Sequence, residues 1–103
     1  LSEPRQIDLR AAAGVSIGAL ELTGDDLHPW ASAGEIVIFD RAKFPKQGMG
    51  CVMELMDGSY RVGLYERTSN GALTFRVLFP NEHAASVPLT ELRGVYAITL
   101  RGL

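Results

Sequence analysis

The stretch from Gly50 to Leu78, GCVMELMDGSYRVGLYERTSNGALTFRVL, decides the fold that the sequence predicts. Asp-Gly and Asn-Gly are the residue pairs most typical of two-residue hairpin turns, because both turn positions need a positive φ. The stretch contains both pairs, and apolar runs flank each of them. It therefore predicts a three-stranded antiparallel meander. The runs are Gly50–Met56, Ser59–Glu66 and Leu73–Leu78, and the turns are Asp57-Gly58 and Asn70-Gly71.

The rest of the chain repeats this pattern of short strands bounded by turn residues. Few windows carry the period of an amphipathic helix. We therefore expect a mainly β domain with at most one or two short helical turns, one of them between Ala84 and Leu92. The other expected strands are Val15–Thr23, Gly34–Phe39, Ala85–Pro88 and Gly94–Leu100.

Composition and charge are those of an ordinary globular domain. The 103 residues suffice for one domain with one core, and 47% of them are hydrophobic and 21% charged. A formal net charge of −2 gives the domain no electrostatic basis for gripping DNA or RNA by itself. The single cysteine, Cys51, fits a reducing compartment, and no apolar run has the length of a membrane span. We expect a cytoplasmic protein that contacts no membrane.

The first residues differ from the rest of the chain. The sequence begins at Leu1 rather than Met, and Leu1–Arg10 is polar and mixed. We interpret the chain as a piece of a longer protein. Residues 1–13 are then the remains of a linker, flexible or helical, and residues 14–103 form the domain. The segment Arg10–Gly14 suits a helix that stops at its glycine.

A polar loop, Gly24-Asp25-Asp26-Leu27-His28-Pro29-Trp30, lies between two of the expected strands. Its residues leave three interpretations open: an aspartate caps a turn that Pro29 stiffens, Asp25, Asp26 and His28 bind a metal ion, or an Asp–His pair performs acid–base chemistry. The capped turn is favoured, because three adjacent ligands rarely converge on one ion without a fourth from elsewhere. Trp30 either covers the edge of the core or fills a partner surface.

The loop and the strand after it also carry a wider pattern. Gly24-Asp25-x-Leu27-x-Pro29, a four-residue gap and then Gly34-Glu35-Ile36-Val37-Ile38-Phe39-Asp40 resemble the signature of the LexA-type family. This family comprises the C-terminal domains of LexA and of phage CI-like repressors, and is related to signal peptidases. Weaker matches follow in order, so that the resemblance covers about Ala19–Leu103. It implies a compact, strongly bent β-sheet assembly in a bacterial or phage-encoded protein.

The same resemblance marks two departures from the family. Asp26 stands at the position of the serine nucleophile, and Gly63 at that of the lysine base. A Ser–Lys dyad works because a desolvated lysine takes the hydroxyl proton, and aspartate and glycine supply neither group. We therefore expect a protein that is not an enzyme, with no cofactor and no metal, in which Asp26 and Gly63 are vestigial. The residues that keep the structural motif are Gly24, Asp25, Pro29, Gly34 and Asp40.

The substitutions carry packing consequences. The lost lysine side chain leaves room at Gly63, which we expect Tyr65 or Leu27 to fill. Asp26 has no cation at the dyad position, so we expect it in solvent or hydrogen-bonded to the amides of its own loop.

Other polar side chains are interpreted as structural or solvated. Cys51 sits in an apolar strand and is taken as a buried small hydrophobe. His28 and His83 are read as surface groups, and the cluster Arg41, Lys43 and Lys46 as a solvated basic loop.

The function that the resemblance implies is regulatory. A transcriptional repressor would carry a helix-turn-helix domain N-terminal to this chain, and DNA would be contacted only there. The present domain would pair two such heads as a homodimer or higher oligomer. Two alternatives stay open: a self-cleaving peptidase that uses unrecognised residues, and a small module that binds a peptide or effector in a degenerate cleft near Asp26 and Gly63.

The last expected strand supplies a dimer hypothesis. Both faces of Gly94–Arg101 are largely apolar, and a strand at the chain end is expected to be a sheet edge with unpaired backbone groups. We therefore predict a two-fold dimer contact through Tyr96, Ile98 and Leu100, with Phe79 or Tyr65 nearby. The alternative is that both faces are buried within one chain.

Overall fold

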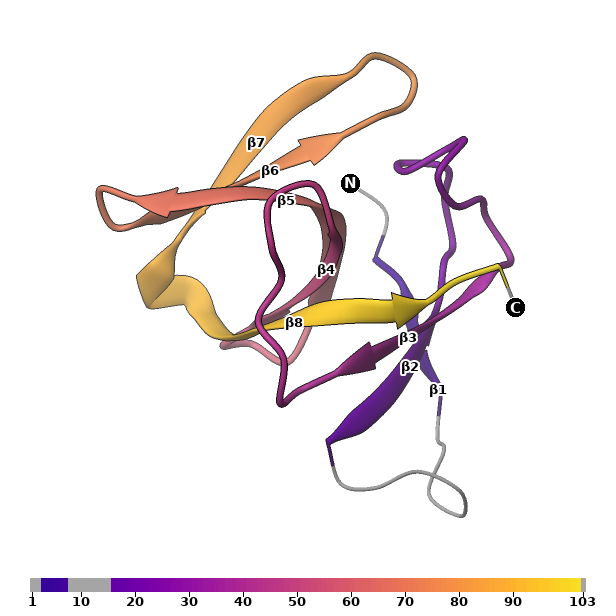
Figure 1. Cartoon of the computed structure of the whole chain (residues 1–103), viewed down its shortest axis with the longest axis horizontal. Coiled ribbons are helices and arrows are strands. Elements are labelled where there is room, and N and C mark those ends of the chain that lie inside the picture. The colour runs from indigo at the N-terminus through magenta and orange to yellow at the C-terminus, as the bar shows by residue number, and fades with distance from the viewer. Residues whose placement is uncertain (1–2, 8–15, 103) are drawn as a thin grey trace.

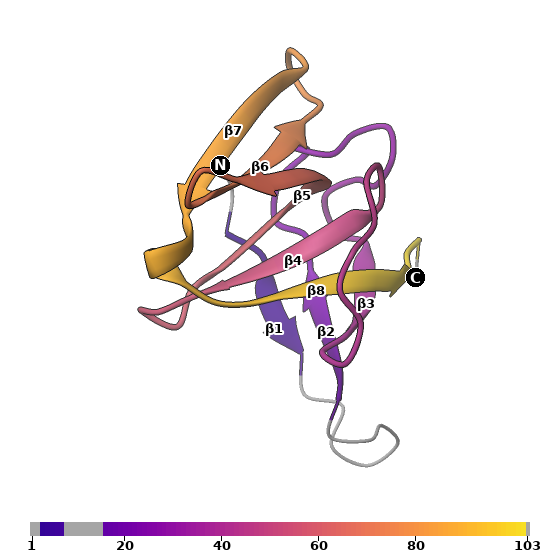
Figure 2. The same cartoon turned by 60° about the vertical axis from the view of Figure 1, so that its left-hand side comes forward.

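A computed structural model describes residues 3–7 and 16–102 as one curled antiparallel sheet (Figure 1). The strand order is β1-β2-β3-β8-β4-β5-β6-β7, so the last strand lies in the middle of the sheet. The sheet bends strongly, as the two views in Figures 1 and 2 show, and the mainly β, strongly bent fold expected from the sequence is confirmed. The strands are β1 (Arg5–Ile7), β2 (Ile17–Glu21), β3 (Ile36–Asp40), β4 (Gly50–Leu55), β5 (Tyr60–Ser69), β6 (Ala72–Val77), β7 (His83–Pro88) and β8 (Leu92–Leu100).

The three-stranded meander is present as β4, β5 and β6. The Asn70-Gly71 turn has the expected positive φ at both positions, whereas at Asp57-Gly58 only the glycine does, in a four-residue connection. Gly58 has φ +90°, while Asn70 and Gly71 have φ +54° and +76°. The backbone N–H and the hydroxyl of Ser59 both donate to the carboxylate of Asp57, at 2.9 and 2.6 Å. The positive φ values explain why asparagine and glycine stand at these turns. The expected helical turn is also found, as the 3₁₀ turn Leu89–Glu91 before β8.

Two apolar clusters form the core, one on each face of the central strands. Successive side chains of β4 point to opposite faces and so enter different clusters. Val52 belongs to the first cluster, and Cys51 and Met53 belong to the second. This double burial explains why β4 is almost continuously apolar. The first cluster contains Leu20, Leu22, Leu27, Ala31, Val37, Phe39, Val52, Tyr60, Val62 and Ile98. The second contains Cys51, Met53, Leu55, Leu73, Phe75, Val77 and Val87.

Strand β1 lies inside the segment that the sequence assigned to a linker. Arg5–Ile7 pairs with β2, with Arg5 opposite Glu21 and Ile7 opposite Ala19. Part of residues 1–13 is therefore an edge strand of the sheet rather than a flexible or helical tether. The expected helix at residues 10–14 falls outside the described residues.

The expectation that the last strand is a sheet edge is wrong. Strand β8 is bonded on one side to β3 and on the other to β4. Tyr96 and Ile98 face the first cluster, and Val95 packs against the second. The apolar character of both faces therefore reflects burial within one chain, which is the alternative that the sequence left open. The exposed residues of β8 are Arg93 near its start and Thr99 and Leu100 at its end.

Among the helical segments of residues 3–7 and 16–102, none has the length and apolar character needed to cross a membrane.

Candidate functional site

The loop between β2 and β3 is closed by its own backbone and by one carboxylate. Leu22 N–H donates to Glu35 O (2.9 Å), and Gly34 N–H to Leu22 O (2.8 Å), which draws the two ends together. Asp25 spans the loop, because its carboxylate accepts the N–H of Ala33 at 2.8 Å. Asp25 is therefore the capping aspartate of the favoured interpretation.

The other motif residues also hold turns. Gly34 has φ +89°, a backbone conformation that favours glycine, and the His28–Pro29 peptide bond is cis. The carboxylate of Asp40 accepts the N–H of Ala42 at 2.9 Å, where the chain leaves β3. Gly24 lies beside Asp26 in the lining of a small cavity. These contacts give the Gly-Asp pattern a structural role that needs no chemistry.

Asp26 ties the loop to the start of the β6–β7 connection. Its backbone carbonyl accepts the N–H groups of Leu78 (2.7 Å) and Phe79 (3.1 Å), and the residue is half-buried. The cavity beside it has a volume of about 10 Å³ and is lined in part by Leu27 and Val62. That space is close to the minimum for one water molecule and far below that of a ligand pocket. This cavity is too small to hold a peptide.

Gly63 faces away from this loop. A Cβ placed on it would lie 2.4 Å from Cδ2 of Phe75, in the second cluster, whereas Leu27 packs in the first. The space at Gly63 is thus filled, but by Phe75 rather than by Tyr65 or Leu27. The Cβ direction of Gly63 and the cavity that Asp26 lines together with Val62 therefore lie on opposite faces of β5.

The polar side chains of the loop have separate partners. His28 Nδ1 lies 3.1 Å from Ser32 Oγ, and the His28 ring contacts Phe79 edge-on at 5.8 Å. Asp25 instead binds the backbone of Ala33. Within residues 3–7 and 16–102, no group of three or more histidine, cysteine or acidic side chains is arranged to hold a metal ion.

Cys51 is fully buried, as the sequence indicated, and burial raises the pKa of its thiol to about 12. A thiolate is the reactive form of cysteine, so this thiol is chemically inert near neutral pH.

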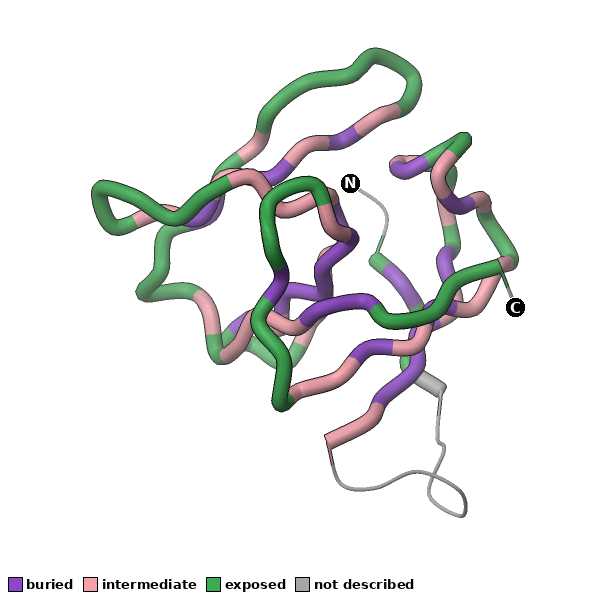
Figure 3. Tube along the Cα trace, in the orientation of Figure 1, coloured by how far each residue is buried: buried purple, intermediate pink, exposed green. Residues whose placement is uncertain are grey.

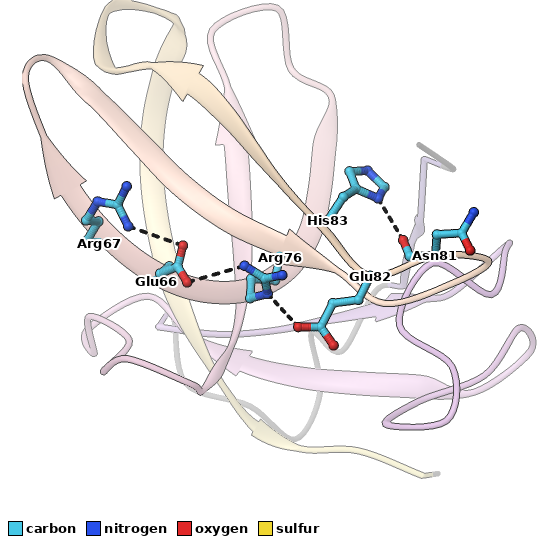
Figure 4. A network of polar contacts seen from close by, with 6 residues as sticks. All are labelled: Glu66, Arg67, Arg76, Asn81, Glu82 and His83. Atoms are coloured by element: carbon cyan, nitrogen blue, oxygen red, sulfur yellow. Dashed lines mark hydrogen bonds and ion pairs between the residues drawn. The ribbon is translucent and has the colours of Figure 1, made fainter.

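A polar network covers the outer side of the β5–β6–β7 hairpins (Figure 4). Glu66 bridges Arg67 (3.3 Å) and Arg76 (3.6 Å), and Arg76 also donates to Glu82 at 2.8 Å. His83 Nδ1 lies 2.8 Å from the carbonyl of Asn81. The charges that border the start of β7 are therefore paired with one another.

Trp30 packs against the edge of the first cluster, as one of its two interpretations expected. A Cβ on Gly50 would lie 2.3 Å from Cη2 of the Trp30 ring, so the indole rests on bare backbone. The Arg101 guanidinium lies 4.3 Å from the ring centroid and donates to the Trp30 carbonyl. Arginine over an indole face adds an attractive cation–π contact.

An open groove runs along the end of β8, beside Trp30. The ladder with β4 stops at Ala97, whereas the ladder with β3 continues to Leu100, so residues 98–100 are paired on one side only. A hollow of about 550 Å³ lies here, and a second of about 280 Å³ adjoins it through Ile98 and Thr99. The first is lined by Lys43, Phe44, Lys46, Met49, Ala97, Ile98 and Thr99, and the second by Trp30, Ile98, Thr99, Leu100 and Arg101.

The sequence did not reveal this groove. Its basic residues were read as a solvated loop, and Arg41 proves different from its neighbours because its guanidinium lies 4.9 Å from the Phe39 ring centroid. The sequence signal was the aromatic Phe44 between Lys43 and Lys46, and the structure leaves 59% of it exposed beside the groove.

Among residues 3–7 and 16–102, the strands at the two edges of the sheet are β1 and β7. Strand β7 is mostly exposed, as Figure 3 shows, and it pairs with β6 without a register shift from Val77–His83 to Ala72–Pro88. After His83 its side chains are small or apolar, with Ala84, Ala85 and Ser86 at the centre.

Comparison of the chain with protein-family models, with curated proteins and with solved structures returned no match. The resemblance to the LexA-type family therefore rests on the residues quoted above.

Proposed function

We propose that this chain is a non-catalytic self-association and regulatory module of a transcriptional repressor, whose DNA-binding helix-turn-helix lies outside the chain. The resemblance of the Gly24–Asp40 segment to LexA-type domains supports the repressor class. The separation of Asp26 from the Cβ direction of Gly63 supports the absence of dyad chemistry. The observation that carries self-association is the free edge of β7.

Edge strands invite pairing with another chain, because their backbone N–H and C=O groups on one side lack partners. Soluble proteins usually protect such edges with charged side chains, bulges, prolines or short length. Strand β1 has two of these protections: it is three residues long and carries Arg5, which is ion-paired to Glu21. Strand β7 has six residues and a continuous register, and its only proline is terminal Pro88.

A second copy is a suitable partner for β7. Antiparallel pairing of two β7 strands about a two-fold axis near Ala85 would set small side chains against small side chains. Glu82 and His83 would lie at the outer ends of the paired segment, away from their symmetry mates. The carboxylate of Glu82 already binds Arg76, so the contact brings no unpaired like charges together.

Such pairing gives a repressor a simple advantage. When two DNA-binding domains are held together, the second half-site is bound in an intramolecular step, at an effective concentration set by the linker. A weak strand contact is then sufficient to strengthen binding to a two-fold operator.

Sedimentation equilibrium of the chain tests the association. The wild-type chain is expected to show dimers, and Ala84→Lys is expected to weaken dimerisation at least about tenfold by placing like charges beside the axis. The matched control is Gln6→Lys, which puts the same exposed charge on the other edge strand and should leave the dimer unchanged. A wild-type chain that stays monomeric up to about 1 mM, or a dimer indifferent to Ala84→Lys, would overturn the proposal.

Two further experiments test the regulatory and non-catalytic parts. In the full-length protein, Ala84→Lys should weaken operator binding in a gel-shift assay, and Gln6→Lys should not. Prolonged incubation of the full-length protein at alkaline pH should yield no self-cleavage product. A cleavage product would favour the peptidase alternative.

A further inference from the structure

The end of β8 offers a second binding surface, separate from β7 in the strand order. Residues 98–100 keep one side of their backbone outside the β4 ladder. A half-free strand beside a groove is the arrangement that accepts an extended peptide as an added strand. The volume of about 550 Å³ is within the range of ligand-binding clefts.

The groove is held in shape by the chain itself. The loop from Lys43 to Met49 runs beside β8, as Figures 1 and 2 show, and its Lys43 carbonyl accepts the N–H of Ala97 at 2.9 Å. The N–H groups of Gly48 and Tyr65 donate to Tyr65 O and Met49 O, both at 2.8 Å. These bonds fix the loop against β5. A preformed groove spares a ligand the free-energy cost of ordering the loop.

The charge of the groove selects its ligand. Among the described residues that line the two hollows, Lys43, Lys46 and Arg101 carry charge, and no acidic side chain is included. Apolar contact area lies between these cations, since Phe44 is 59% and Leu100 57% exposed. The chain as a whole has a formal charge of −2, so this basic lining is a local feature.

We infer that this groove binds an extended acidic segment of a partner protein, which adds as a strand to residues 98–100 of β8. Alternate side chains of the segment would rest on Phe44 and Leu100, and its carboxylates would meet Lys43, Lys46 and Arg101. A second copy of this chain fits less well, because a two-fold contact would set these three cations against their own symmetry mates. A nucleic acid also fits less well, because it lacks the amide groups that complete a strand ladder.

The single tryptophan of the chain reports on this site, because Trp30 lines the second hollow. The probe is an acetylated, amidated peptide of about seven residues with alternating leucine and glutamate, titrated while the emission of Trp30 is recorded. Two comparison probes are titrated in the same way. One is the same peptide with lysine in place of glutamate, and the other is an oligothymidylate of similar length. We expect saturable binding of the acidic peptide, and binding at least about tenfold weaker for both comparison probes.

Variants of the chain complete the test. Lys43→Glu combined with Lys46→Glu should weaken the acidic peptide at least about tenfold, whereas the charge-matched Arg61→Glu combined with Arg67→Glu should not. N-methylation of alternate peptide amides should weaken binding similarly, because it removes ladder hydrogen bonds. Circular dichroism confirms that each variant is folded. Absence of binding at about 1 mM, equal binding of the lysine peptide or of oligothymidylate, or insensitivity to the Lys43 and Lys46 changes would overturn the inference.

This inference stands apart from the proposed dimer. Ala84→Lys should leave peptide binding intact, and the Lys43 and Lys46 changes should leave the sedimentation mass intact. Failure of one proposal is therefore distinguishable from failure of the other.

Discussion

Gly63 and Phe75 share the space of a single side chain. A Cβ on Gly63 would lie 2.4 Å from Cδ2 and 3.0 Å from Cγ of the Phe75 ring, which is fully buried. The ring cannot retreat without disturbing the second cluster, so overpacking is expected to be costly. Gly63→Ala should lower the free energy of unfolding by about 1–3 kcal/mol, measured by urea denaturation.

A double-mutant cycle controls this prediction. Phe75→Leu removes part of the ring, and the Gly63→Ala change should cost less in that background than in the wild type. Additive effects of the two changes would contradict the direct contact. The same geometry implies that a lysine placed at position 63 would disrupt the fold.

A lysine should destabilise the protein strongly at Ile98 but hardly at Leu100, although the two residues lie in the same strand. Ile98 is 6% exposed in the first cluster, whereas Leu100 is 57% exposed. Ile98→Lys should destabilise the protein by about 3–5 kcal/mol or unfold it, because it buries an unpaired cation. Leu100→Lys should change stability by about 0.5 kcal/mol or less. Thermal unfolding followed by circular dichroism gives both values. A stable, monomeric Ile98→Lys variant would instead favour the dimer contact through Tyr96, Ile98 and Leu100.

Alkaline pH should destabilise the fold through the buried Cys51 and the partly buried Tyr96. Burial raises the pKa of Cys51 from 9.0 to about 12, and burial together with the hydrogen bond to Glu54 raises the pKa of Tyr96 from 10.0 to about 12. Each group keeps its proton in the folded state at pH values where the unfolded chain has lost it. Their contribution to stability is therefore complete below about pH 9 and declines between about pH 9 and 12.

Urea unfolding at about pH 8 and about pH 10.5 measures this decline. Cys51→Ala and Tyr96→Phe should each make the alkaline loss smaller than in the wild type, whatever their effect at the lower pH. An unchanged loss in the double variant would assign it to other groups.

Asp25 should stabilise the loop more than its exposed position suggests. Its carboxylate accepts the N–H of Ala33 across eight residues of chain, which holds the loop closed. Asp25→Ala should lower the free energy of unfolding by about 1 kcal/mol, while Asp25→Asn, which keeps an acceptor oxygen, should cost less. Equal costs for the two variants would show that the negative charge, rather than the hydrogen bond, is what matters.

Local chemistry made most of the strands predictable. Asp57-Gly58 and Asn70-Gly71 mark the turns of the meander, because few other residues adopt a positive φ so readily. The place of β8 was not predictable by the same reasoning. Its pairing with β3 and β4 joins residues far apart in the sequence. An apolar strand also has the same sequence pattern whether its own chain covers both faces or a partner covers one of them.

The candidate sites show the same division. The loop motif predicted a turn capped by Asp25 or Asp26, and Asp25 makes such a bond within the loop. Which strand face Gly63 occupies depends on the register between β4 and β5, where Gly63 stands opposite Cys51 of the second cluster. The groove lined by Lys43 and Thr99 is formed by segments far apart in the sequence, so no local sequence pattern predicts it.

The central position of β8 has a consequence for how the chain acquires its fold. Strands β1–β3 and β4–β7 form ladders within themselves, but β3 and β4 are joined only through β8. During synthesis, β1–β3 and β4–β7 are made before β8, so β3 and β4 each lack one neighbouring strand until β8 is made. Closing such distant contacts is slow, since loop entropy is lost before the contacts form. A chain truncated before Leu92 should therefore keep the ladders β1–β3 and β4–β7 but lack the strand that joins them, which leaves β3 and β4 each with an open edge for chaperones and proteases.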